Sequence, residues 1–166
     1  MGIGIGHGKV IRVHLRDLRF SPLRSRRADS GAETGYASGS GTHEGIRAKI
    51  PAMKVDVRHV DDVIIVDLEG RLVMGVGDEL LRDVMNELVA EDWKKILLNL
   101  RKVTIIDSSG IGEVVSSWKL AKRFGGTVKL LRPGPQIQRT LLLTQLLPLL
   151  EIFDDEDEAV ASFQTA

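Results

Sequence analysis

Two adjacent serines, Ser108 and Ser109, are the side chains in this sequence with the clearest chemical potential. They follow an apolar, β-branched run at residues 103–106 and a single acid, Asp107, and a helical pattern begins directly after them. The spacing predicts a strand that delivers two hydroxyls to a helix N-terminus, where unpaired N–H groups and the helix dipole favour an anion. A phosphoryl group on a serine is such an anion, so we expect a regulatory phosphorylation site here.

A catalytic serine would need a base, and the sequence supplies none after the motif. All four histidines precede it: His7, His14, His43 and His59. The turn lacks the preceding glycine of a hydrolase elbow, and the sequence has no phosphate-binding loop or zinc-binding histidine pair. With no cysteine, thiolate chemistry and zinc–sulfur sites are also excluded. We therefore predict a protein that is not an enzyme and has no catalytic residue, cofactor or metal of its own.

Helix capping is the simpler explanation of the motif, because aspartate and serine are both good N-caps. Capping accounts for one polar residue, however, and leaves the second hydroxyl and the glycines Gly110 and Gly112 without a role. Glycine costs about 1 kcal/mol relative to alanine inside a helix. We expect both glycines to leave the first turn open to a closely approaching partner.

Hydrophobic periodicity places this turn within an alternation of strands and helices. Strands are expected at residues 54–60, 63–68, 95–100, 103–106, 127–131 and 149–153, the third and fourth counting as one strand of the sheet. Helices are expected from residue 78, after residue 108, at 137–147 and at the C-terminus. Alternating strands and helices favour parallel pairing with right-handed crossovers. The prediction is an α/β domain over residues 53–166, a mixed, mostly parallel sheet packed by helices in the order ββαβαβαβα.

The first 52 residues differ in composition from the rest of the chain. They hold 9 Lys+Arg and 4 Asp+Glu, whereas residues 53–166 hold 14 and 19. Residues 28–45 are rich in Gly, Ser, Ala and Thr, and such a segment cannot bury enough apolar surface to fold. We expect residues 1–52 to be a disordered extension. A further hypothesis is that the native protein starts at Met53.

Charge and hydropathy also limit the partners and the compartment. A mildly acidic domain is a poor candidate for binding phosphate backbones, so we expect no nucleic-acid partner. No apolar run approaches the ~20 residues of a membrane-spanning helix, so we expect no membrane partner. The absence of cysteine fits a reducing cytoplasm.

At the level of families, the predicted order of elements resembles the STAS domain, the fold of bacterial anti-sigma factor antagonists. Residues 106–112, Ile-Asp-Ser-Ser-Gly-Ile-Gly, are similar to that family's signature. Residues 68–72 resemble the end of its second strand, and residues 152–159 its closing strand and helix. Two positions depart from the pattern: Val73 stands where many members carry an aspartate, and residues 144–146 lie where a glycine often follows the third helix.

The resemblance implies a partner switch. In that family the unphosphorylated antagonist binds an anti-sigma factor serine kinase and frees the sigma factor, phosphorylation of the first serine ends the complex, and a PP2C-type phosphatase restores it. By position, the resemblance makes Ser108 rather than Ser109 the acceptor. It assigns the surrounding residues to the partner-binding surface: Asp107, Ser108, Ser109, Gly110, Ile111 and Gly112. The alternative is a STAS subunit of a stress-sensing or lipid-transport complex that no anti-sigma kinase regulates.

Overall fold

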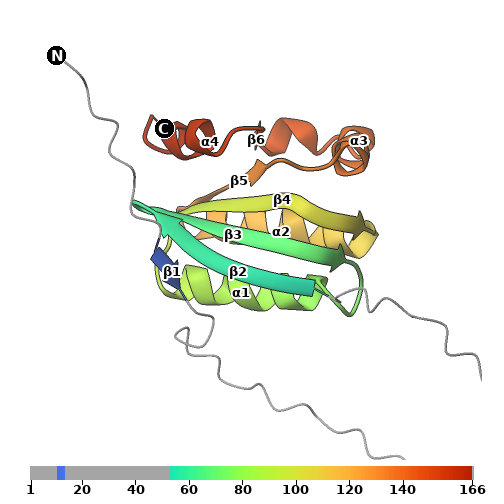
Figure 1. Ribbon diagram of the computed structural model, residues 1–166, viewed down its shortest axis with the longest axis horizontal. Helices are drawn as coiled ribbons and strands as arrows, with labels where there is room; N and C mark the ends of the chain where they lie inside the picture. The colour runs from blue at the N-terminus through green and yellow to red at the C-terminus, as the bar shows by residue number, and fades with distance from the viewer. Residues whose placement is uncertain (1–10, 14–52, 166) are drawn as a thin grey trace, which may run out of the picture.

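A single sheet with helices on both faces forms the body of the protein (Figure 1). The computed structural model describes residues 11–13 and 53–165. In chain order the elements are β1 (Ile11–Val13), β2 (Met53–Val60), β3 (Val63–Leu72), α1 (Asp78–Ala90), β4 (Lys95–Ile106), α2 (Ser108–Arg123), β5 (Thr127–Leu131), α3 (Pro135–Leu143), the 3-10 helix η1 (Leu147–Leu149), β6 (Ile152–Phe153) and α4 (Glu156–Ser162). No described helix has the length and hydrophobicity that a bilayer-spanning segment needs.

The strands lie in the sheet in their chain order, β1 to β6. The β1–β2 and β2–β3 pairs are antiparallel, and the remaining pairs are parallel. From β2 onward this confirms the predicted ββαβαβαβα order. β3 continues four residues beyond its predicted end at Leu68. This extension contains Gly70, with φ 110°, and its pairing with β4 has two irregularities, at each of which β4 carries one extra residue. β4 likewise runs through residues 101 and 102 as one strand.

β1 lies within the segment for which no strand was expected. It pairs with β2 so that the Cα atoms of Ile11 and Val13 face those of His59 and Val57. The other residues of that segment, 1–10 and 14–52, lie outside the described part of the chain. The disordered extension and the start at Met53 therefore stay predictions.

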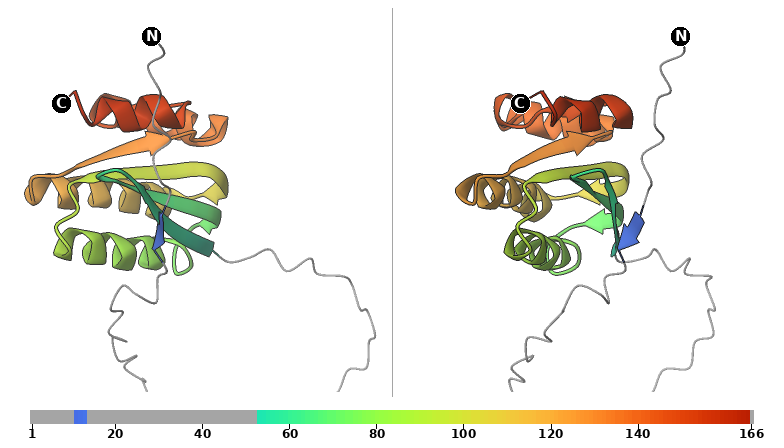
Figure 2. Two further views of the ribbon diagram at one scale, coloured as in Figure 1. Left: turned by 60° about the vertical axis from the view of Figure 1, so that its left-hand side comes forward. Right: turned by 90° about the vertical axis from the view of Figure 1, so that its left-hand side faces the viewer.

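Two hydrophobic cores lie on opposite faces of the sheet. Figure 2 shows α1 and α2 on one side of the sheet and α4 on the other. Side chains alternate along β3, so that Ile64, Val66 and Leu68 join the larger core while Val63 and Ile65 join the smaller one. The larger core packs under α1, α2 and α3, and the smaller core packs against α4. Because α4 is short, it covers only part of its face.

α3 is shorter than predicted and ends at Leu143 instead of residue 147. Gln145 adopts a left-handed conformation with φ 57°, and the N–H groups of Gln145 and Leu146 donate to the carbonyls of Leu142 and Leu141. This is the Schellman arrangement that commonly closes a helix, with glutamine in the position that glycine usually takes. The chain then forms η1, and the last strand, predicted at 149–153, is limited to β6.

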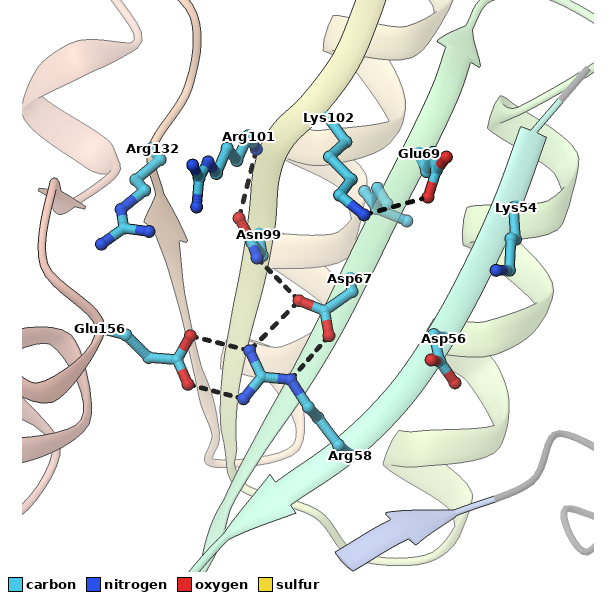
Figure 3. A pocket seen from close by; sticks show the side chains of 11 residues that line it. Lys54, Asp56, Arg58, Asp67, Glu69, Asn99, Arg101, Lys102, Arg132 and Glu156 are labelled. Carbon is cyan, nitrogen blue, oxygen red and sulfur yellow. Dashed lines mark hydrogen bonds and ion pairs between the residues drawn. The ribbon is translucent and has the colours of Figure 1, made fainter. Parts of the chain in front are cut away.

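One arginine joins β2, β3 and α4 on the face that α4 only partly covers (Figure 3). Arg58 donates from Nε to Asp67 Oδ2 at 2.6 Å and from Nη1 to Glu156 Oε1 at 2.6 Å, and its Nη2 also contacts both carboxylates. Asn99 of β4 donates to Asp67 Oδ1 at 2.7 Å. The pKa of Arg58 is raised above its usual value, chiefly by the hydrogen bond to Glu156.

Removing this arginine should destabilise the domain. We expect Arg58→Met to lower the free energy of unfolding by about 2 kcal/mol, because it leaves Asp67 and Glu156 facing each other without a cation. The loss should stay below that of a fully buried pair, since both carboxylates are about one-third exposed. Urea denaturation measures the change. The control is Lys102→Gln, which breaks an exposed 3.5 Å pair with Glu69 and should cost less than ~0.5 kcal/mol.

Candidate functional site at the junction of β4 and α2

Asp107 is the residue that caps α2. Its backbone is extended, with φ −108° and ψ −174°, and its Oδ1 accepts a hydrogen bond from Gly110 N at 2.9 Å. Its carbonyl accepts from Ile111 N at 3.0 Å. The capping explanation is therefore correct for the aspartate, and it leaves both serines free for another role.

The carboxylate of Asp107 also holds the loop that follows β3. Its Oδ2 accepts from Met74 N at 3.0 Å, while Asp107 N donates to the carbonyl of Leu72 at 3.4 Å. The hydrogen bond from Gly110 lowers the pKa of Asp107 most, followed by the one from Met74. The sequence analysis missed this cross-link, because it joins residues 33 positions apart that carry no shared local signal.

The two serines occupy the first two positions of α2. Ser108 is exposed and Ser109 is half-buried. Within the described part of the chain, neither hydroxyl has a hydrogen-bond partner or ion-pair contact. The first turn of α2 contains no acidic residue, and the acid that precedes it is the cap Asp107. A negatively charged group on Ser108 would lie in the favourable field of the helix N-terminus.

The two glycines of the motif have different roles. Gly110 is buried, and a Cβ added there would collide with the carbonyl oxygen of Leu72 and meet the side chain of Ile106 at 2.8 Å. Close packing inside the domain therefore explains Gly110, which corrects the expectation that it keeps the turn open for a partner. Gly112 is exposed, with no atom within 4 Å of an added Cβ. Of the two, Gly112 alone leaves the surface open.

An apolar groove of about 480 Å³ runs beside the serine. Its walls come from the end of β4, from α2 and from the end of α3, and include Ser108, Gly112, Thr140 and Leu146. Further apolar surface is exposed close by in the chain, including Leu143, which is 77% exposed. Of the residues predicted to bind a partner, Ile111 contributes to the groove but also packs into the larger core.

Nothing near Ser108 in the described residues has the arrangement of a catalytic site. His59 lies next to the β2–β3 turn, where its Nδ1 is 3.2 Å from the carbonyl of Asp61. Because Val63 pairs with Lys95 at the start of β4, that turn is at the opposite end of β4 from Ser108. Among the described residues, no three His, Asp or Glu side chains gather as metal ligands would.

Alanine substitutions should distinguish the buried glycine, Gly110, which is required for packing, from the exposed glycine, Gly112. We expect Gly110→Ala to lower the free energy of unfolding by about 2 kcal/mol, because the backbone of Leu72 must move away. Gly112→Ala, the matched control, should raise it by up to about 1 kcal/mol, since alanine is favoured inside a helix and meets nothing here. Urea denaturation of both variants provides the comparison. Equal effects would contradict the assignment of the clash to Gly110.

Asp107→Asn tests the double hydrogen bond. An asparagine oxygen can replace one acceptor, but its amide group cannot accept from the second N–H. We expect the variant to be less stable than the wild type at pH 7. Because folding lowers the pKa of Asp107, the wild-type advantage should be complete above the ordinary value of 3.8 and shrink as the pH falls through the lower, folded-state value. Urea denaturation from pH 7 to pH 3 measures this, and a pH-independent difference would argue against it.

Known proteins share this architecture. An anti-sigma F factor antagonist from Paenibacillus polymyxa is 25% identical over 112 residues, which cover 68% of this chain and 96% of that protein. The phosphorylated form of the Bacillus cell fate determinant SpoIIAA matches with a TM-score of 0.55 and 20% identity, over 66% of this chain and 99% of that one. A sulfate transporter family protein from Wolinella succinogenes matches with a TM-score of 0.56 and 21% identity, over 63% and 86%.

The match to a protein family covers the region that contains the β4–α2 junction with its two serines. Residues 54–159 match the STAS domain, and this range includes every strand from β3 to β6 and the complete β4–α2 junction. The match covers well over half of the chain. The protein therefore belongs to the STAS domain family.

Proposed function

We propose that this protein is an anti-sigma factor antagonist that binds an anti-sigma factor through the β4–α2 junction, and that phosphorylation of Ser108 ends this binding. The observation that carries the proposal is the exposed Ser108 hydroxyl, which has no partner among the described residues and borders an apolar groove. A curated relative of the same domain is named an anti-sigma F factor antagonist, which supports the general role.

The physical basis of the switch is the cost of burying charge. A phosphoryl group adds about −1.5 to −2 charges at neutral pH. On the free protein those charges remain in water at a helix N-terminus, where the dipole favours them. A partner packed over the groove would have to strip them of water. Each 1.4 kcal/mol of that penalty weakens binding about tenfold, so a few kcal/mol is enough to release the partner.

The chemistry of phosphorylation is assigned to the partners. The carboxylate of Asp107, next to Ser108, is engaged with the backbone N–H groups of Gly110 and Met74, so we assign the base, the ATP and its metal to an anti-sigma factor that is itself a serine kinase. A PP2C-type phosphatase would remove the phosphoryl group again. This role places the protein in the cytoplasm, together with the transcription machinery.

The decisive experiment is incubation with the anti-sigma kinase and ATP, followed by mass spectrometry that locates the phosphate. We expect one phosphoryl group on Ser108 in the wild type and in Ser109→Ala, and none in Ser108→Ala. A phosphate on Ser109 would overturn the choice between the serines. An unmodified protein that binds no anti-sigma kinase would favour the alternative, a scaffold or accessory STAS subunit.

Binding measurements with the same kinase test the switch itself. Ser108→Ala should bind whether or not ATP is present, whereas Ser108→Asp should bind at least tenfold more weakly than the wild type. Ser109→Asp is the matched control, because it adds the same negative charge at the neighbouring, half-buried serine. Circular dichroism must show native helix content in each variant. Equal affinities of Ser108→Ala and Ser108→Asp would rule out a charge switch at this position.

A further inference from the structure

A second hollow, of about 320 Å³, lies on the face of the sheet that α1 and α2 do not cover (Figure 3). Charged side chains dominate its lining, which contrasts with the apolar groove beside Ser108. Lys54 comes from β2, Arg101 and Lys102 come from β4, and Arg132 follows β5 directly. The Arg58 network described above forms one wall of this hollow. Nothing in the proposed switch uses these residues.

The carboxylates that line the hollow are occupied. Asp67 accepts from Arg58 and Asn99, and Glu156 accepts from Arg58. Glu69 pairs with Lys102 at 3.5 Å, and Asp56 also has a partner. Each of these carboxylates therefore already interacts with a neighbouring group, and Asp67 and Glu156 share Arg58.

Three of the cations lack such compensation. The side chains of Lys54 and Arg101 have no hydrogen-bond or ion-pair partner among the described residues. Arg132 donates only Nε, to the carbonyl of Asp154 at 2.5 Å, and both of its terminal nitrogens stay available. Figure 3 shows the side chain of Arg101 extending from β4 toward Arg132. Two guanidinium groups without a counter-charge leave a positive site in the hollow.

The backbone of Arg132 is also unusual, with φ 49°. Three other non-glycine residues in the described chain are left-handed, and each has a local reason: Asp61 and Asp92 lie in turns, where aspartate tolerates this conformation, and Gln145 closes α3. Arg132 instead follows a strand, with its N–H donating to the carbonyl of Phe153 at 2.8 Å. Unfavourable backbone conformations of this kind concentrate at ligand sites, where they hold a side chain in a required position.

We propose that this hollow binds a small phosphate monoester, whose dianionic group Arg101 and Arg132 hold from two sides. A phosphate carries about two negative charges and three acceptor oxygens, which suits the paired donors of two guanidinium groups. The volume of the hollow is at the lower end of the range for small-molecule sites. Asp67 and Glu156 both accept hydrogen bonds from Arg58, and the lining as a whole holds five cationic side chains against four carboxylates, so its net charge still favours an anion.

The test is a titration of the full chain with phosphate, in which the chemical shifts of the backbone amides are measured by NMR. Chloride keeps the ionic strength constant throughout. The probes are inorganic phosphate and glycerol 3-phosphate. We expect saturable shifts at Arg101, Lys102 and Arg132, with the ester binding at least as tightly as the free ion. Arg101→Gln and Arg132→Gln should each weaken binding about tenfold or more. Arg123→Gln, an exposed arginine of α2, is the matched control and should bind like the wild type.

Three results would overturn the proposal: shifts that never saturate, an equal loss in Arg123→Gln, or tighter binding of succinate than of either phosphate probe. Arg101 lies within β4, at an irregularity of its pairing with β3, and its side chain has no partner among the described residues. Arg101→Gln therefore breaks no described side-chain contact and keeps the test valid even if Arg132→Gln disturbs the backbone. The site lies on the other face of the sheet from α2. Ser108→Ala should therefore bind phosphate like the wild type, so this site and the serine switch can fail independently.

Discussion

The close approach of the Leu72 carbonyl to the first turn of α2 is the contact on which the position of Ser108 depends. This oxygen accepts the N–H of Asp107 and occupies the space that a side chain at position 110 would need. Because β3 and β4 pair in parallel, both strands end at this point, and the carboxylate of Asp107 adds Met74 to the same arrangement. The serine is thus presented from a junction of three segments that is complete before any partner arrives.

Local patterns predicted the order of strands and helices and the location of the serine turn, because both follow from periodicity and from short motifs. Features that depend on distant contacts escaped prediction. The role of Gly110 requires knowledge of Leu72, and the second hydrogen bond of Asp107 reaches Met74. The end of α3 was placed too late because Gln145 adopts a conformation that is usually recognised by a glycine.

The sheet separates two surfaces of opposite character. One carries the serine, the groove and exposed leucines, and it suits a protein partner that excludes water. The other surface carries ionic groups beside the smaller core, on the face of the sheet that α4 only partly covers. Arg58 has two roles on this second surface, since it ties α4 to the sheet and forms hydrogen bonds with two of the acids that line the hollow. Sites with no shared side chains are expected to act additively.

The isolation of the Ser108 hydroxyl has a consequence for timing. Since that exposed oxygen makes no hydrogen bond or ion pair among the described residues, a group attached to it breaks no such internal interaction. The domain would pass between its modified and unmodified forms without a refolding step, and the interval between signal and response would be set by enzyme turnover and partner dissociation. Such a protein retains no memory of its previous state once the group is removed.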